Sequence, residues 1–136
     1  MDAFDADVLI YAVTPDHPHG RRVRRLFAEA PGRHVGIGSV VLLPEVLAKP
    51  LRNGSTREIA ELTRLLSRLD LRPADPVIAE AATSLAAAHR LHAADAFHLA
   101  TAVVAGADRF ITNNRRDFGP SITEVDVVYP DALDEP

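Results

Sequence analysis

Residues 91–118, LHAADAFHLATAVVAGADRFITNNRRDF, carry the clearest evidence for the fold, because a helix, a strand and a polar loop follow one another there. The helix is expected over residues 93–105. It is apolar almost all round, which is typical of a helix packed on several sides. Gly106 is expected to end it, and a short strand is expected over residues 109–112.

One polar stripe interrupts this apolar helix. Asp95, His98 and Thr101 recur at every third position and therefore share one face. A carboxylate on a mostly buried helix is costly unless a partner compensates its charge. Asp117 closes the strand–loop unit that follows, at the end where open α/β sheets hold their ligands. The stretch therefore indicates a charged site as well as a fold.

The rest of the chain alternates short apolar runs with helical patterns. Residues 3–12 are expected to form a first strand that turns into a short helix. Further strands are expected at residues 34–38, 71–73 and 122–128, and further helices at 21–30, 40–49, 56–69 and 76–90. Ser39 is read as a helix cap, although Pro44 also allows a later start or a bend, and Pro50 is read as a helix stop. The tail from Tyr129 is read as loose. This order predicts one α/β sandwich over residues 1–136, with a mainly parallel sheet.

Composition limits the possible functions. The chain has 136 residues, 47% of them hydrophobic, which suffices for one domain with a core. It has no cysteine, which excludes disulfides, thiolate metal sites and cysteine nucleophiles. No apolar run is long enough to span a membrane and the N-terminus lacks a signal-peptide pattern, so an intracellular, cytoplasmic protein is expected.

Acidic residues stand within apolar segments. Asp5 and Asp7 interrupt the first strand–helix run, and Glu45 is the only acid between residues 31 and 57. With Asp95 and Asp117 they are too widely spaced for one ligand loop, so any shared site must come from tertiary structure. Such an all-oxygen set favours Mg²⁺ or Mn²⁺. Simpler interpretations remain open, with Asp7, or else Asp5, as the cap of the helix that follows, and with Glu45 as a surface residue.

Four segments together resemble the PIN-domain ribonucleases, particularly the VapC-type toxins of bacterial toxin–antitoxin pairs. They are FDADVLIYA, SVVLLPEVLA, LHAADAFHLATAVVAGA and RFITNNRRDF. The resemblance covers essentially the whole chain in the family's order. It implies a PIN-like α/β/α sandwich with a parallel sheet of about five strands. It also implies a Mg²⁺- or Mn²⁺-dependent endoribonuclease acting on RNA, often a homodimer, held inactive by a cognate antitoxin.

The same resemblance assigns roles to the acids. Asp5, Glu45 and Asp95 fall on the family's first three acids, which are both catalytic and metal-binding. Many members carry the fourth acid where this chain has Asn114, and others carry it three residues later, at Asp117. We expect Asp117 to be the fourth acid and Asn114 to be a neutral helper.

Other polar residues are expected to support this site. Asp7 departs from the family, which often has Asn or Ser at that position. Thr112 and Asn113 are expected to position water or phosphate, although a plain turn would also explain them. Arg115 and Arg116 are expected to contact RNA phosphates, because arginine forms forked contacts with phosphate oxygens.

The overall charge gives a weaker argument about a nucleic-acid partner. The net charge is −4, which at first disfavours a nucleic-acid partner. Two divalent cations held by the acids would bring it to about zero. Of the basic residues, fourteen are arginines and one is a lysine.

Three alternative interpretations remain. The DADVL segment resembles the opening of haloacid-dehalogenase-like phosphatases, with Asp5 as nucleophile and Asp7 as acid/base, but Lys49 comes too early for that class. A non-catalytic α/β module that binds a protein partner would tolerate unlinked acids. His92, Asp95 and His98 have a spacing that would also suit a transition metal.

Overall fold

The computed structural model describes residues 1–134 and contains one five-stranded sheet. The strands are β1 (Asp2–Phe4), β2 (Gly36–Ser39), β3 (Leu69–Arg72), β4 (Arg109–Ile111) and β5 (Asp126–Val128). Their order is β3-β2-β1-β4-β5, and every neighbouring pair is parallel. The expected α/β architecture with a parallel sheet of about five strands is confirmed.

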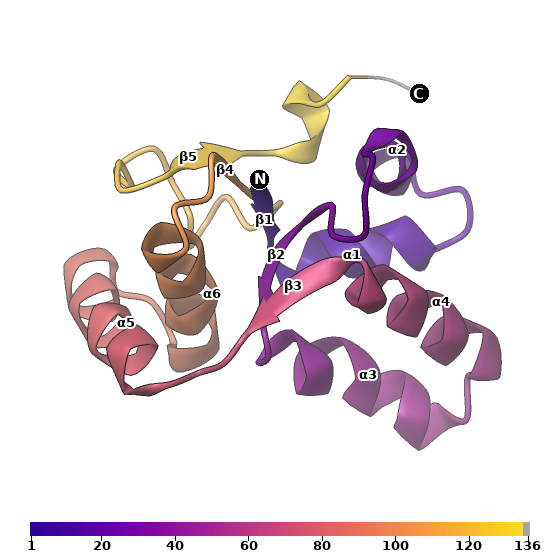
Figure 1. The fold of residues 1–136 in the computed structure, drawn as a ribbon, viewed down its shortest axis with the longest axis horizontal. Helices are drawn as coiled ribbons and strands as arrows, with labels where there is room; N and C mark the ends of the chain where they lie inside the picture. The colour runs from indigo at the N-terminus through magenta and orange to yellow at the C-terminus, as the bar shows by residue number, and fades with distance from the viewer. Residues whose placement is uncertain (135–136) are drawn as a thin grey trace.

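Six helices cover the two faces of this sheet (Figure 1). They are α1 (Ala6–Val13), α2 (Pro18–Glu29), α3 (Leu42–Asn53), α4 (Thr56–Ser67), α5 (Pro76–His89) and α6 (Ala93–Val104). The first four pack on one face and the last two on the other. Because a parallel sheet needs cover on both faces, this arrangement suits its short apolar strands. None of the helices in residues 1–134 is long and apolar enough to cross a bilayer.

The strands alternate their side chains between two cores. In β1, Ala3 faces the α5–α6 layer and Phe4 faces the α1–α4 layer. In β4, Phe110 and Ile111 divide in the same way. All four side chains are at most 2% exposed, so successive residues of each strand are buried on opposite faces.

The chain reverses its progress across the sheet between β1 and β4. From β1 it adds β2 and then β3 on one side, and the α5–α6 crossover then returns it to β4 on the other side of β1. The carboxyl ends of β1 and β4 therefore lie together at a topological switch point, where open α/β sheets bind ligands. The Asp5 N–H donates to the Ile111 carbonyl at 3.0 Å and joins the two strand ends.

The predicted cap at Ser39 and the predicted stop at Pro50 are both wrong for α3, which begins later, at Leu42. Ser39 is the last residue of β2, and its hydroxyl accepts a hydrogen bond from the Val41 N–H at 3.1 Å. The helix continues through the buried Pro50 and ends at Gly54, which has a φ of 65°. Proline so close to a helix end removes one hydrogen bond without ending the helix, whereas glycine adopts the left-handed closing conformation readily.

The C-terminal segment also differs from expectation. The last strand covers only residues 126–128 of the expected 122–128, although Ile122 and Val125 are buried. The supposedly loose tail forms a short 3-10 helix, η1 (Pro130–Ala132), and Leu133 is only 5% exposed. Arg22 on α2 donates to the Leu133 carbonyl at 2.7 Å. Apolar contact and this hydrogen bond therefore hold the tail as far as it is described; residues 135–136 lie outside that part.

Candidate active site

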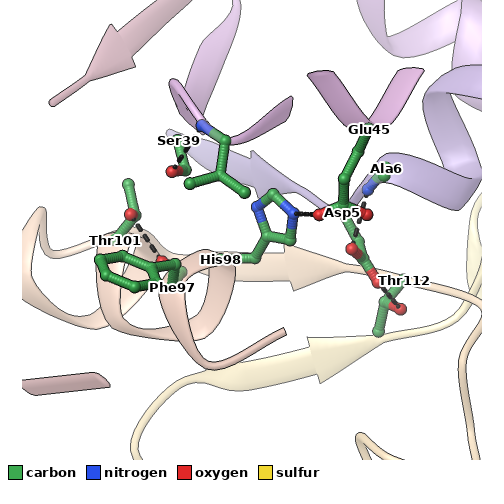
Figure 2. Close-up of polar contacts among 9 residues, drawn as sticks. Asp5, Ala6, Ser39, Glu45, Phe97, His98, Thr101 and Thr112 are labelled. Carbon is green, nitrogen blue, oxygen red and sulfur yellow. Dashed lines mark hydrogen bonds and ion pairs between the residues drawn. The ribbon is translucent and has the colours of Figure 1, made fainter. Parts of the chain in front are cut away.

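Asp5 lies at the switch point, directly after β1 and at the N-cap of α1. Its Oδ1 accepts from the Ala6 N–H at 2.8 Å, and its Oδ2 accepts from the Thr112 hydroxyl at 2.7 Å (Figure 2). Asp5 is 4% exposed, and burial raises its pKa above the ordinary value of 3.8 although the nearby His98 opposes the rise. The structure therefore keeps a nearly buried carboxyl group at the end of the central strand.

Asp7 lies in the first turn of α1, on the side of β4. Its carboxylate accepts from the Val8 N–H at 2.7 Å and from the Asn113 N–H at 3.0 Å. Burial, followed by repulsion from Asp5, raises the pKa of Asp7 to about 7. The cap of α1 is Asp5, so the interpretation of Asp7 as the capping residue is wrong. Asp7 ties the loop after β4 to the start of α1.

Glu45 comes from the first turn of α3, the helix that follows β2. Its side chain is 33% exposed, and its Oε1 lies 2.5 Å from the Nε2 of His98 on α6. Glu45 therefore does not point freely into solvent, as a plain surface glutamate would. The pair joins helices on opposite faces of the sheet at its carboxyl edge (Figure 2).

Asp95 lies in the first turn of α6 and is partly buried. Burial raises its pKa to about 6, with further contributions from the charges of Asp5, Asp117 and Glu45. The structure thus brings Asp95 within range of the charges of the three other expected acids. Asp95 is the residue on which the other three act.

The loop after β4 contributes the remaining polar groups. The Asn114 side-chain amide donates to Asp117 Oδ2 at 2.9 Å, and the Asp117 N–H donates to Asn114 Oδ1 at 3.2 Å. The Asn114 N–H donates to the Thr112 hydroxyl oxygen at 3.1 Å. Asn114 therefore orients Asp117, and Thr112 is fully buried against Asp5. Thr112 thus contacts Asp5 directly, whereas Asn113 contributes its backbone N–H to Asp7.

The chemistry of this donor set fits a hard divalent cation. The donors are carboxylate oxygens, which Mg²⁺ and Mn²⁺ prefer. Burial and repulsion between carboxylates raise the pKa values of Asp5, Asp7 and Asp95. A bound cation would oppose this rise, because it stabilises the ionised carboxylates. Within residues 1–134, no three His, Asp or Glu side chains already surround one point as ligands do. Binding would therefore involve rotation of these side chains.

The two arginines after β4 have different surroundings. Arg115 donates to Asp131 at 2.5 Å, and its guanidinium lies 4.2 Å from the centre of the Tyr129 ring. Arg116 is exposed and has no hydrogen-bond or ion-pair partner among residues 1–134. The structure thus engages the first arginine with the C-terminal segment and leaves the second one accessible.

Sequence reasoning missed the contact between His98 and Glu45. It assigned His98 a supporting or surface role, yet His98 is 2% exposed. The stripe of Asp95, His98 and Thr101 on an apolar helix was the available signal. His92 is exposed at the N-cap of α6, which separates it from the buried His98 and disfavours a shared transition-metal site.

Comparisons with known proteins agree with this architecture. The PIN domain family matches residues 3–119. A toxin–antitoxin complex from Klebsiella pneumoniae contains a similar chain, with a TM-score of 0.75 and 24% identity over 96% of this chain and 98% of that one. DNA-bound VapBC from Salmonella typhimurium has a TM-score of 0.73 and 19% identity, covering 95% and 97%.

VapBC2 from Rickettsia felis, bound to a DNA fragment from its promoter, is also similar. Its TM-score is 0.72 at 16% identity, covering 94% of this chain and 97% of that one. No curated protein matches the sequence. At such low identities, the structural likenesses show a shared fold.

Proposed function

Because this chain belongs to the PIN-domain family, we propose that it is a metal-dependent endoribonuclease and the toxin of a VapC-type toxin–antitoxin pair. The resemblance identified in the sequence is confirmed at the level of the family, which is one of nucleases. The preference for RNA, the use of Mg²⁺ or Mn²⁺ and the role as a toxin are parts of the proposal.

The proposal rests mainly on the position of Asp95, which lies near the charges of three acids that are distant from it in the sequence. The pKa of Asp95 is raised by burial and by Asp5, Asp117 and Glu45, which come from three other segments. Stability alone does not favour such a gathering, because buried like charges repel. A bound cation explains it, since it converts the repulsion into attraction.

The four acids share one role in this proposal, and two neighbouring polar residues support them. Asp5, Glu45, Asp95 and Asp117 would hold the cation, which when bound supplies charge neutralisation and a more acidic water. Thr112 holds the Asp5 carboxylate by a hydrogen bond, and Asn114 holds that of Asp117. Hydrolysis would then add water across a phosphodiester bond without a covalent enzyme intermediate.

Substrate and partners extend the proposal. Arg116, with Arg115 beside it, would contact RNA phosphates next to the four acids. The similar structures from Klebsiella pneumoniae and Salmonella typhimurium are a toxin–antitoxin complex and VapBC, which supports an antitoxin partner for this chain. A homodimer is proposed from the family resemblance, and light scattering on the purified protein tests it.

A cleavage assay tests the proposed function. The protein is incubated with single-stranded RNA and Mn²⁺, with and without EDTA, beside Asp5→Asn, Asp95→Asn and the exposed control Glu80→Gln. We expect cleavage by the wild type and the control, and losses of at least about 100-fold in the two site variants and in EDTA. Cleavage that persists in EDTA or in both site variants contradicts the proposal. Release of phosphate from small phosphomonoesters would instead favour the phosphatase.

A further inference from the structure

His98 is an ionisable side chain to which the proposed mechanism assigns no task. Its side chain is completely buried on α6, yet it reaches across to α3 (Figure 2). There its Nε2 lies 2.5 Å from Glu45 Oε1. The ring thus joins a helix on one face of the sheet to a helix on the other.

The contact with Glu45 identifies the hydrogen-bond donor. An ionised carboxylate only accepts hydrogen bonds, so the His98 Nε2 must carry the hydrogen and donate it. The other ring nitrogen, Nδ1, is buried and has no hydrogen-bond partner within residues 1–134. A histidine that served packing alone would rarely leave a buried nitrogen unpaired. Within residues 1–134, the hydrogen bond to Glu45 is therefore the only polar contact of the His98 ring.

Glu45 needs such an anchor. It has a long side chain that is one-third exposed and has many rotamers available to it. With Oε1 held by His98, its other oxygen, Oε2, has no hydrogen bond within residues 1–134. One oxygen is therefore fixed while the second is available to a cation.

The position of His98 on α6 links it to a second acid. Asp95 and His98 are three residues apart and lie on the same face of the helix. Burial holds α6 rigidly against the sheet, since Ala96, Leu99 and Ala100 are at most 1% exposed. The same helix thus carries Asp95 and, through His98, holds one oxygen of Glu45.

We propose that His98 is a positioning residue that orients Glu45 for cation binding through its Nε2–H donor. The inference rests on the proposed function, because it gives His98 a part in building the metal site. Groups that hold a metal-ligating side chain in place commonly change metal affinity by 10- to 100-fold when they are removed. In this proposal the four acids would bind the cation, whereas His98 would act through Glu45.

Mn²⁺ binding measured by calorimetry, without RNA, tests the proposal. His98→Leu removes the donor and keeps an apolar side chain in the core, and we expect a Kd about 10-fold weaker. His98→Gln keeps an N–H donor near the position of Nε2, and we expect a Kd within about threefold of the wild type. Thr101→Val is the matched control, because Thr101 is equally buried on the same face of α6 and, within residues 1–134, its hydroxyl bonds only to the Phe97 carbonyl of its own helix.

A double-mutant cycle shows whether His98 acts through Glu45. In a Glu45→Ala background, His98→Leu is expected to change the Mn²⁺ affinity no further. The proposal is overturned if His98→Leu binds Mn²⁺ as the wild type does, if His98→Gln is as impaired as His98→Leu, or if the two substitutions act additively. A wild-type protein that binds no Mn²⁺ would instead overturn the proposed function, so the two failures are distinguishable.

Discussion

The Thr112 hydroxyl donates a hydrogen bond to Asp5 Oδ2 at 2.7 Å, so a residue just after β4 holds the carboxylate just after β1. Both residues are buried, with Thr112 at 0% and Asp5 at 4% exposure. Adjacent parallel strands bring their carboxyl ends together, and this bond uses that proximity to fix a charged group where little water reaches it.

Loss of that hydroxyl is expected to destabilise the protein. Thr112→Val keeps the shape of the side chain but removes the donor, which leaves one buried Asp5 oxygen unpaired. We expect the free energy of unfolding to fall by about 1–3 kcal/mol, measured by urea denaturation at pH 7 in EDTA. Thr112→Ser restores the hydroxyl and should recover most of the loss. Equal stabilities of Thr112→Val and the wild type would show that Asp5 does not depend on this donor.

Removal of one acid is expected to stabilise the metal-free protein while it weakens cation binding. The pKa of Asp95 is raised to about 6, so ionisation of this carboxyl group at neutral pH costs more free energy in the folded protein than in the unfolded chain. Allowing for its partial exposure, Asp95→Asn should gain about 1 kcal/mol, or about 3 °C in Tm, in EDTA. The Tm increase on adding Mn²⁺ should shrink in the variant, because a ligand is lost. A lower Tm in EDTA would contradict the repulsion that we infer.

The stability of the metal-free protein is expected to depend on pH in one direction. The pKa of Asp7 rises from 3.8 to about 7 in the folded state, so between these values the folded protein binds more protons than the unfolded chain. The free energy of unfolding should therefore fall as the pH rises from about 4 to about 7, and should level off above. Asp5 and Asp95, whose pKa values are also raised, act in the same direction.

Urea denaturation across this pH range in EDTA provides the measurement. Asp7→Asn should flatten the slope, most clearly between pH 5 and about 7, whereas Glu80→Gln on the exposed side of α5 should leave it unchanged. A slope that Asp7→Asn does not alter would assign the pH dependence to other groups.

The two arginines after β4 are expected to contribute unequally to RNA binding. Arg116 is exposed, whereas Arg115 is engaged by Asp131 and Tyr129. Arg116→Ala should weaken binding of single-stranded RNA and reduce the slope of log K against log salt by about 0.7, the loss of one phosphate contact. Arg115→Ala should change the slope less. RNA binding is measured by fluorescence anisotropy in EDTA at several salt concentrations. An unchanged slope for Arg116→Ala would show that Arg116 does not contact RNA phosphates.

Local patterns in the sequence were sufficient to predict the order of the strands and helices. Ala3 and Phe4 alternate between two cores, and Gly106 follows the apolar helix that packs on the sheet. Such features repeat with the period of a strand or helix, so they are readable over a few residues. The unusual position of Asp5 and Asp95 among apolar residues was readable for the same reason. The continuation of α3 through Pro50 could not be predicted from the local sequence, because the burial of that proline outweighs its local tendency to end a helix.

Tertiary structure was needed to establish which side chains meet. The hydrogen bond between Thr112 and Asp5 joins residues 107 positions apart, and that between His98 and Glu45 joins residues 53 apart. Neither pair has a local signature, because each contact depends on how crossovers order the strands and how α3 and α6 pack across the sheet. The amino-acid pattern therefore indicated which residues were chemically unusual, whereas the folded chain established their partners, since hydrogen bonds require atoms within about 3 Å of each other.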